Sequence, residues 1–453
     1  MAETVAALSS GLVPSGVAVI RVSGPQVRFT LEKIAGIRPS PRKASLRTFS
    51  DPQTGQRIDK GLALFFPAPN SFTGEDVAEF HCHGGRAVVD AMLRALWSLD
   101  GVRAADAGDF TRQAFVNGKL DLTQVEAVGD LIHASTSLQL DQALAQLDGA
   151  ATRKLSAWKE ALADCRAQIE ADLDFSDEDD VPGSVVDSLP EQLGILKSAI
   201  EDELSSHVAE RVRDGFQVVL AGAPNSGKST LLNALLERDA VLVSPIAGTT
   251  RDQIDVPIDL DGLPVILTDT AGLRETQYSV DPIERMGMDR ARLAAAQADC
   301  MVWLVGGDED PESSSEELLV PREKTIRVRS KLDIAGDRDS VDKVDLCVSG
   351  KTREGLFALK SAIVTLLRDQ HGLIDRAFTV GDGIALDARR RTALRSSLRY
   401  IDEAVVLLDQ GSSSLDHAAE ALRLAQRALG EISGDVDAEQ LLDRVFSRFC
   451  IGK

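Results

Sequence analysis

The 453-residue sequence predicts a multidomain protein of mixed α/β and α class. Three observations lead to this fold class. The chain is longer than one hydrophobic core usually supports, its apolar spacing changes along the chain from short runs to helical repeats and back, and helical spacing returns near the C-terminus. We therefore expect an N-terminal α+β domain, a discontinuous helical domain, and an α/β domain inserted between the two helical parts.

Residues 1–118 mix short apolar runs with turn signals. The runs 16–22, 61–66 and 77–81 resemble strands, and residues 87–99 have helical spacing. This mixture predicts the α+β domain.

Residues 119–213 and 372–453 carry the helical spacing. In the first part, apolar residues such as Leu155, Trp158 and Leu162 recur three or four positions apart, and Leu394 and Leu398 do so in the second. Between them, residues 214–371 alternate apolar strand-like runs with helical segments, which is typical of a parallel α/β sheet.

Composition limits the function classes. A net charge of −21 argues against non-specific coating of nucleic acid, so any RNA contact must be local. The densest basic patch is expected to be a solvated helix face rather than a phosphate track, although both remain open. It consists of Arg389, Arg390, Arg391, Arg395 and Arg399.

No apolar run is long enough for a membrane span, the N-terminus does not resemble a secretory signal, and the five cysteines form no close pairs. These features predict a cytoplasmic protein. Four cysteines are expected to act as small buried hydrophobic residues, namely Cys82, Cys165, Cys300 and Cys347.

A phosphate-binding loop is the strongest signal. The strand-like run 216–221 leads into Gly-Ala-Pro-Asn-Ser-Gly-Lys-Ser at 222–229, and a helical segment follows. Backbone N–H groups of such a loop surround phosphates, Lys228 reaches the terminal phosphates, and the Ser229 hydroxyl suits Mg²⁺.

Two further motifs predict a GTP-binding switch. Asp269-Thr-Ala-Gly272 follows a strand, where the carboxylate suits a metal and the glycine a γ-phosphate. Ser330-Lys-Leu-Asp333 places a carboxylate where it can accept the two N–H groups of guanine's edge, although asparagine usually stands at the position of Ser330. We expect GTP rather than ATP. The residues predicted to bind GTP are Asn225, Ser226, Gly227, Lys228, Ser229, Thr230, Ser244, Pro245, Ile246, Ala247, Gly248, Thr249, Thr250, Asp269, Thr270, Ala271, Gly272, Ser330, Lys331, Leu332, Asp333, Ser349, Gly350 and Lys351.

Leu273 occupies the position where small GTPases often have a water-orienting glutamine. Leucine cannot polarise water, so catalysis needs another water-positioning group and another positive charge at the phosphates. The segment 244–252 is rich in hydroxyl and carbonyl oxygen, as a loop around phosphate and a monovalent cation would be.

With these motifs the chain resembles the potassium-activated GTPases, specifically the MnmE (TrmE) family of tRNA-modification GTPases, nearly from end to end. The resemblance implies that K⁺ is bound by Asn225, Ser244, Ile246 and Thr249, and Mg²⁺ by Ser229 and Thr250. It also implies that Glu284 activates the attacking water.

The resemblance extends to both ends of the chain. It implies an N-terminal domain that binds 5-formyltetrahydrofolate or a related folate through Arg21, Glu79, Lys119 and the C-terminal Lys453. The terminus Cys450-Ile-Gly-Lys453 matches the family, in which this cysteine is functional. His81 and His83 are expected to mark a strand end rather than a metal site.

The resemblance further implies a homodimer that works with an FAD-containing MnmG-like partner. Together they would add a (carboxymethyl)aminomethyl group to C5 of the wobble uridine of tRNA. Two alternatives remain open at this point: a ribosome-assembly or regulatory GTPase switch, and a one-carbon folate enzyme with a regulatory GTPase insert.

Overall fold

The computed structural model describes residues 3–174, 188–222, 226–239, 255–269, 298–306, 321–333, 344–373, 383–410 and 412–435, with residues 445, 446, 449, 451 and 452 near the C-terminus. The chain forms two compact units. One contains Met1–Gly129, Gln146–Ser198 and Thr392–Lys453, and the other contains Asp130–Ala145 and Ala199–Arg391. Each unit therefore combines segments that are distant in the sequence. Among the described helices, none has the length and apolar character that a membrane crossing requires.

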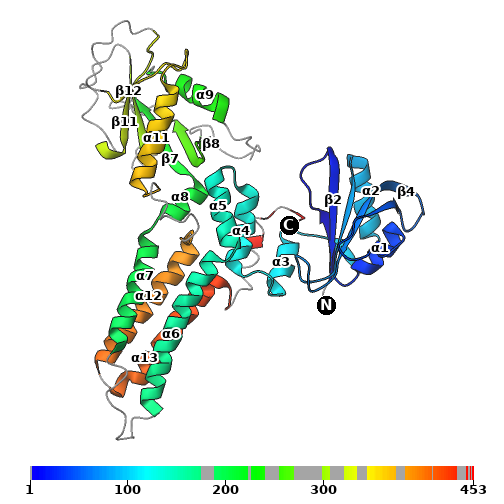
Figure 1. The fold of residues 1–453 in the computed structure, drawn as a ribbon, viewed down its shortest axis with the longest axis horizontal. Helices are drawn as coiled ribbons and strands as arrows, with labels where there is room; N and C mark the ends of the chain where they lie inside the picture. The colour runs from blue at the N-terminus through cyan, green and yellow to red at the C-terminus, as the bar shows by residue number, and fades with distance from the viewer. Residues whose placement is uncertain are drawn as a thin grey trace, which may run out of the picture. The chain divides into compact units, whose positions relative to one another are not determined.

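The N-terminal part of the first unit is a six-stranded sheet with the order β3-β4-β5-β2-β1-β6. Its strands are β1 (Thr4–Leu8), β2 (Ser15–Ser23), β3 (Ser45–Ser50), β4 (Arg57–Phe66), β5 (Val77–Gly84) and β6 (Val102–Ala104). Helices α1 (Val27–Ala35) and α2 (Arg86–Trp97) pack on the sheet (Figure 1). Because side chains alternate along a strand, Ala18, Ile20 and Val22 of β2 are buried in the core, while Arg21 points to the other face.

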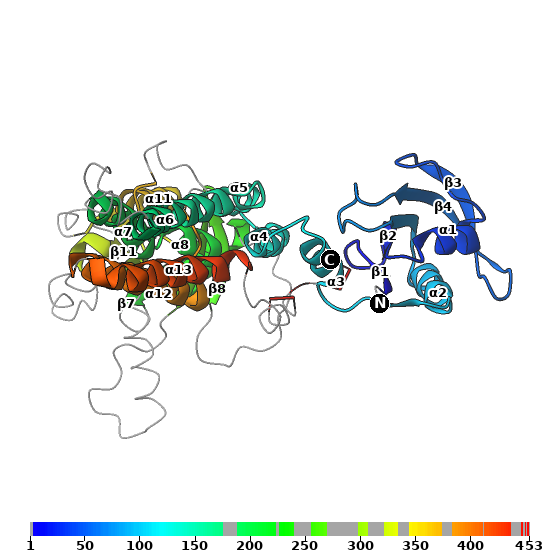
Figure 2. The ribbon, with the colours of Figure 1, turned by 90° about the horizontal axis from the view of Figure 1, so that it is seen from below.

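The helical part of the first unit joins segments from both sides of the α/β insert. Helices α6 (Ala150–Asp174) and α13 (Leu415–Ser433) lie side by side in both views (Figure 1, Figure 2). Leu155 and Leu162 of α6 and Leu422 and Leu429 of α13 are buried. The expected discontinuous helical domain is therefore confirmed, because residues more than 250 positions apart share one core.

Further helices complete the two units. Their bounds are α3 (Asp109–Val116), α4 (Leu122–His133), α5 (Ser137–Leu147), α7 (Leu189–Ser205), α8 (Val208–Asp214), α9 (Lys228–Asp239), α11 (Leu356–Gln370) and α12 (Ala388–Asp409), with short 3-10 turns at Arg322–Lys324 and Ser412–Ser414. Lys197 of α7 pairs with Asp402 of α12 at 2.5 Å, so these two helices also bring distant parts of the chain together.

The second unit contains a six-stranded sheet with the order β12-β11-β10-β7-β9-β8. Its strands are β7 (Phe216–Gly222), β8 (Asp255–Leu260), β9 (Leu263–Asp269), β10 (Cys300–Val305), β11 (Thr325–Arg329) and β12 (Leu346–Cys347). The pairs are parallel except for β8 with β9. Every residue of β10 is buried, as is usual for a central strand of a parallel sheet. The predicted inserted α/β domain is thus confirmed.

The order of the strands determines where a ligand can bind. After β7 the chain adds β8 and β9 on one side of that strand, and β10, β11 and β12 on the other. Open α/β sheets bind ligands outside the carboxyl ends of the strands at such a switch point. The end of β7, where the phosphate-binding loop begins, is this position.

Asp299 contacts the segments that lead into and out of the α/β domain. It lies at the end of the sheet opposite the phosphate-binding loop. Its buried carboxylate accepts a hydrogen bond from the backbone N–H of Gln217 at 2.8 Å and pairs with Arg211 of α8 at 3.1 Å. His371, directly after α11, lies 3.5 Å from the same carboxylate. One buried acid therefore joins the segment that leads into the sheet to the segment that leaves it.

Candidate functional site

The phosphate-binding loop starts at a position that only glycine can fill. Gly222 ends β7 with φ of 149°, and a Cβ atom there would lie 2.4 Å from the carbonyl oxygen of Leu304. Gly227 also has positive φ, and α9 begins at the next residue, Lys228. The first N–H groups of a helix lack partners within the helix and attract anions. The end of β7 and the start of α9 thus form a phosphate-binding geometry.

Lys228 folds back toward the loop. Its Nζ donates to the carbonyl oxygen of Gly222 at 3.0 Å, which holds the ammonium group beside the strand end. A flexible lysine in this position brings positive charge to the phosphates of a bound nucleotide. The predicted role of Lys228 is consistent with this placement.

Asp269 and Ser229 meet at the end of β9. This strand lies next to β7, with Leu220 opposite Asp269, and Oδ2 of Asp269 is 3.4 Å from the Ser229 hydroxyl. Oδ1 is buried and has no hydrogen-bond partner among the described residues. A buried carboxylate oxygen without a donor is costly unless a cation satisfies it. The oxygen donors of Ser229 and Asp269 therefore fit a hard divalent cation such as Mg²⁺.

Asp333 is positioned by the loop that follows β12. The Ser349 hydroxyl donates to Oδ1 of Asp333 at 2.8 Å, and this hydrogen bond holds the pKa of the carboxyl below its usual value. Ser349 itself is fully buried, and its Oγ accepts the backbone N–H of Thr352 at 3.1 Å. The structure thus brings together Asp333 and the 349–351 loop, which the sequence places 16 or more residues apart.

Gly350 allows this loop to approach the phosphate-binding helix. A Cβ atom at Gly350 would lie 3.1 Å from backbone atoms of Thr230 and Leu231. Ser330, at the end of β11, approaches the same region, because its hydroxyl donates to the backbone carbonyl of Ser226. The described parts of three predicted motifs therefore converge on one site.

Several predicted site residues lie outside the described residues. These are Asn225, Ser244, Pro245, Ile246, Ala247, Gly248, Thr249, Thr250, Thr270, Ala271, Gly272, Glu284, Cys450 and Lys453. The K⁺ ligands, the second Mg²⁺ ligand and the water-activating glutamate therefore remain predictions.

A second candidate site lies on the face of the N-terminal sheet opposite helices α1 and α2. Arg21 of β2 and Glu79 of β5 are register neighbours, and they form an ion pair with Nη2 3.0 Å from Oε1. The guanidinium of Arg21 also lies 5.7 Å from the ring centroids of Phe72 and Phe110. The structure thus brings together two of the predicted folate ligands and adds two aromatic rings.

Lys119 lies beside the turn that contains Phe72. The Asn117 side chain donates to the carbonyl oxygen of Thr73 at 2.7 Å, and a Cβ atom at Gly74 would touch both Asn117 and Lys119. Phe72 is 40% exposed, although a large aromatic side chain is usually buried. Phe72 was not among the residues predicted to bind folate. The turn-rich segment 70–76 that contains it was the only signal in the sequence.

The C-terminal tail is attached to the same unit. Ile451 forms an antiparallel bridge with Ala107, and the Ser9 hydroxyl donates to the carbonyl oxygen of Gly452 at 2.8 Å. A Cβ atom at Gly452 would lie 2.0 Å from the carbonyl oxygen of Leu8, so the close approach requires glycine. Leu8 ends β1, the strand that pairs with β2 and places Ala7 opposite Arg21. Ile451 and Gly452, the two residues between Cys450 and Lys453, are thus held against the N-terminal part of the unit, and Gly452 lies at the end of β1.

Comparisons with known proteins decide the family. A family model described as the MnmE helical domain matches residues 122–450, and one described as the GTP-binding protein TrmE N-terminus matches residues 4–119. The tRNA modification GTPase MnmE of Brucella anthropi is 46% identical over 452 residues, which cover 100% of this chain and 98% of that protein. The chain belongs to the MnmE family. Its counterpart in Brucella suis biovar 1 is also 46% identical, with the same coverage.

One of the similar solved structures matches about a third of the chain. It is the G domain of the T. maritima FeoB iron transporter, which is 28% identical, with a match that covers 33% of this chain and 98% of that one and a TM-score of 0.27. Membership of the MnmE family rests on the two family models and the full-length relatives alone.

The basic patch of this MnmE-family chain differs from the solvated face expected from its sequence. Arg390 is buried and donates to the carbonyl oxygen of Ala385 at 2.5 Å. Arg391 pairs with Glu210 of α8 at 2.6 Å and donates to the carbonyl oxygen of Leu204. The expectation of a solvated face was wrong for these two arginines, because Arg390 folds back on the segment before α12 and Arg391 contacts α8 and the end of α7.

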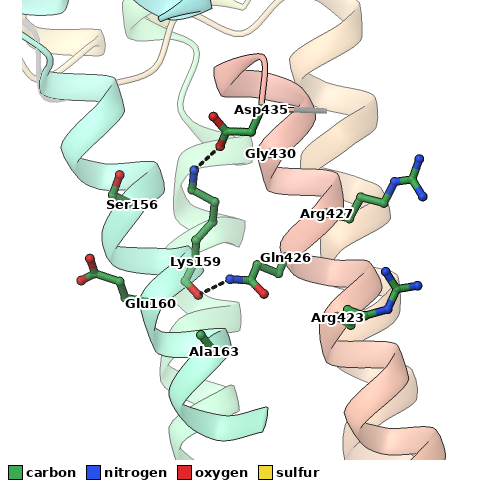
Figure 3. A pocket seen from close by; sticks show the side chains of 9 residues that line it. All are labelled: Ser156, Lys159, Glu160, Ala163, Arg423, Gln426, Arg427, Gly430 and Asp435. Carbon is green, nitrogen blue, oxygen red and sulfur yellow. Dashed lines mark hydrogen bonds and ion pairs between the residues drawn. The ribbon is translucent and has the colours of Figure 1, made fainter. Parts of the chain in front are cut away.

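A polar groove of about 790 Å³ lies between α6 and α13 (Figure 3). Lys159 crosses it to pair with Asp435 at 2.6 Å, and the Gln426 amide donates to the carbonyl oxygen of Lys159 at 3.3 Å. Arg423, on the rim, pairs with Glu420 at 2.7 Å. These contacts hold the two helices together and neutralise much of the positive charge of the groove.

The cysteines mostly follow their predicted environment. Cys82, Cys165 and Cys300 are buried free thiols, whereas Cys347 is only half-buried, so the expectation of burial was wrong there. Cys347 lies on the short strand β12 at the edge of the sheet, where one side has no neighbouring strand. Burial raises the pKa of Cys82 to about 11 and that of Cys300 to about 12, so these thiols stay protonated at neutral pH.

Proposed function

We propose that this chain is the GTP-hydrolysing subunit of a complex that modifies the wobble uridine of tRNA. The observation that carries the proposal is that the motifs of Lys228, Asp269 and Asp333 lie around one candidate nucleotide site. This site lies in a chain that is 46% identical, over its whole length, to proteins named tRNA modification GTPase MnmE.

Guanine recognition rests on Asp333. An ionised carboxylate accepts the N1–H and N2–H groups of guanine, whereas adenine offers no such pair on that edge. The hydrogen bond from Ser349 supports this role because it lowers the pKa of the carboxyl and fixes one of its oxygens. GTP is therefore the preferred nucleotide.

Mg²⁺ would be held by Ser229 and Thr250, with Asp269 next to the cation. The ion would neutralise charge on the β- and γ-phosphates when bound. Two observations support this assignment. Oδ1 of Asp269 is buried and has no hydrogen-bond partner among the described residues, and the Ser229 hydroxyl oxygen lies 3.4 Å from Oδ2 of the same carboxylate.

Hydrolysis in this chain requires substitutes for the missing glutamine, since Leu273 cannot orient water. We assign that role to Glu284 and assign K⁺ binding to Asn225, Ser244, Ile246 and Thr249, as the family resemblance implies. K⁺ would supply positive charge near the phosphates, and Glu284 would accept a proton from the attacking water.

The N-terminal sheet would bind 5-formyltetrahydrofolate or a related folate. Glu79 can accept N–H groups of the pterin, Arg21 and Lys119 can pair with the carboxylates of the glutamate tail, and Phe72 offers an aromatic face. The attachment of Gly452 beside β1 supports the participation of Lys453 and of the catalytic candidate Cys450.

An FAD-containing MnmG-like partner would supply the redox chemistry for adding a (carboxymethyl)aminomethyl group at uridine C5. The chain would act as a homodimer and contact tRNA locally, because its net charge is −21. A GTPase switch without modification chemistry would not account for the contacts between the C-terminal tail and the domain that carries Arg21.

Steady-state hydrolysis by the full chain tests the GTPase assignment. GTP should be hydrolysed and should displace a labelled guanine nucleotide, whereas ATP should do neither, and the rate should be higher in K⁺ than in Na⁺. Glu284→Ala should lose turnover but keep nucleotide affinity. An ATP preference would overturn the assignment of the base, and equal rates in K⁺ and Na⁺ would overturn the role of K⁺.

A further inference from the structure

Ser330 stands where GTPases of this type usually have asparagine, and the structure shows how its hydroxyl is used. The side chain is 4% exposed, and its hydroxyl donates to the backbone carbonyl of Ser226 in the phosphate-binding loop. The carbonyl oxygen of Val305 is a second, longer acceptor at 3.3 Å. The backbone N–H of Ser330 donates to that same carbonyl at 3.0 Å, which fixes the end of β11 against β10.

A hydroxyl has one hydrogen to donate, whereas a primary amide has two. Both acceptors near Ser330 are backbone carbonyls, and the contact with Ser226 is the shorter of the two. The single hydroxyl hydrogen of Ser330 is therefore already donated to a backbone carbonyl of the protein. Guanine N7 accepts hydrogen bonds and cannot donate them, so it would need a donor that Ser330 no longer has.

The contact between Ser330 and the loop is close. A Cβ atom at Gly227 would lie 3.7 Å from Oγ of Ser330 and 3.8 Å from its Cβ, so the serine packs directly on the turn that precedes α9. Asp333, three residues later, lies on the exposed end of the same segment and is held by Ser349. Ser330 thus contacts the phosphate-binding loop, whereas Asp333 is the residue placed to contact the base.

We propose that Ser330 holds the phosphate-binding loop in place and does not read the base, so that this site recognises guanine through its Watson–Crick edge alone and is indifferent to N7. This proposal rests on the GTP site described above. It extends the accepted ligand class to guanine nucleotides in which N7 is replaced by carbon. An asparagine at position 330 would restore a donor for N7.

The test compares the affinities of the full-length wild-type chain for GDP and 7-deaza-GDP, measured by displacement of a fluorescent guanine nucleotide. We expect the two affinities to agree within about twofold. A hydrogen bond to a buried acceptor is worth about threefold to tenfold in affinity, so a wild-type loss of fivefold or more with 7-deaza-GDP would overturn the proposal.

Two variants separate the functions of the side chain. Ser330→Ala should weaken GDP and 7-deaza-GDP equally, by about threefold to tenfold, because the loop loses its tether. Ser330→Asn should make the chain prefer GDP over 7-deaza-GDP by about threefold or more. If Ser330→Asn does not fold, the wild-type ratio and Ser330→Ala still decide: a changed ratio in Ser330→Ala contradicts the proposal.

The outcomes distinguish this proposal from the GTP assignment. Tight binding of GDP with strong discrimination against 7-deaza-GDP would contradict the proposed role of Ser330 but would not affect the assignment of the chain as a GTPase. Weak binding of both GDP and 7-deaza-GDP, together with equal binding of ATP and GTP, would instead contradict the assignment of the site to guanine nucleotides.

Discussion

The hydroxyl of Ser349 lies 2.8 Å from Oδ1 of Asp333 and donates a hydrogen bond to it. The hydrogen bond stabilises the ionised form, so the pKa of Asp333 lies below its usual value. The carboxylate therefore stays ionised, and able to bind guanine, to a lower pH than an isolated aspartate would. As the pH falls through this lowered pKa, the contribution to nucleotide binding is lost.

Ser349→Ala should raise the pKa of Asp333 and move the acid loss of nucleotide affinity to higher pH. The dissociation constant of GDP, followed between about pH 4 and pH 7, should rise earlier on acidification in the variant than in the wild type. Ser205→Ala, which removes an exposed hydroxyl distant in sequence from the loop, serves as the control. Identical pH profiles for Ser349→Ala and wild type would refute the role of Ser349.

Asp269→Asn should raise the Mg²⁺ concentration needed for GTP hydrolysis by about tenfold or more, because it removes the charge beside the proposed cation. The same substitution should not destabilise the chain in EDTA, since it replaces a carboxyl group, one of whose buried oxygens has no described partner, by a neutral amide. Mg²⁺ titration of hydrolysis and thermal unfolding in EDTA check the two effects.

Asp255→Asn is the matched control for the magnesium prediction. Asp255 lies on the partner strand of the same hairpin and accepts the Thr268 hydroxyl at 2.6 Å, which an amide oxygen can also accept. The Mg²⁺ concentration that Asp255→Asn needs for GTP hydrolysis should match that of the wild type. An unchanged requirement in Asp269→Asn would exclude Asp269 from the cation site.

Asp299→Ala should lower the free energy of unfolding of the second unit by about 1–3 kcal/mol. The substitution leaves the Gln217 N–H and Arg211 without their acceptor at the buried end of the sheet. Urea unfolding measures the change. Asp369→Ala, at an exposed position on the adjacent helix α11, should change stability by about 0.5 kcal/mol or less. Equal effects of the two substitutions would show that the Asp299 cluster does not hold the ends of the insert.

Glu79→Gln should weaken binding of 5-formyltetrahydrofolate by about tenfold or more, because it removes the charged acceptor next to Arg21. Phe72→Ala should also weaken binding if the exposed ring contacts the pterin. Isothermal titration calorimetry with the full chain gives both values. Asp59→Asn, whose carboxylate pairs with His83 on the same sheet, is the control and should bind normally. If Glu79→Gln binds 5-formyltetrahydrofolate with wild-type affinity, the folate does not bind at Glu79.

The described motifs of the candidate nucleotide site could be found in the sequence because each of them is short and lies at the end of a strand. The run 222–229 needs no distant residue to be recognised, and the parallel sheet then brings Asp269 to the same edge. The fold class was predictable for a related reason, since apolar spacing reports local structure. The predicted domain boundaries at residues 118, 213 and 371 stay predictions.

Long-range contacts were not predictable from local patterns. Ser330 and Ser226 are separated by 104 residues, and only the folded sheet brings the hydroxyl to the loop. Arg390 and Arg391 belong to a cluster of arginines expected on an exposed helix face, yet Arg390 is buried and donates to the carbonyl oxygen of Ala385, and Arg391 pairs with Glu210 of α8. Helical periodicity identifies a face but not the element that covers it.

The nucleoside composition of tRNA tests the central claim most directly. Mass spectrometry of tRNA from a strain lacking this chain should show loss of the modified wobble uridine, and the wild-type chain should restore it. Cys450→Ser should fail to restore it while its GTP hydrolysis remains normal in vitro. A deletion strain with a full complement of modified wobble uridine would contradict the proposed function.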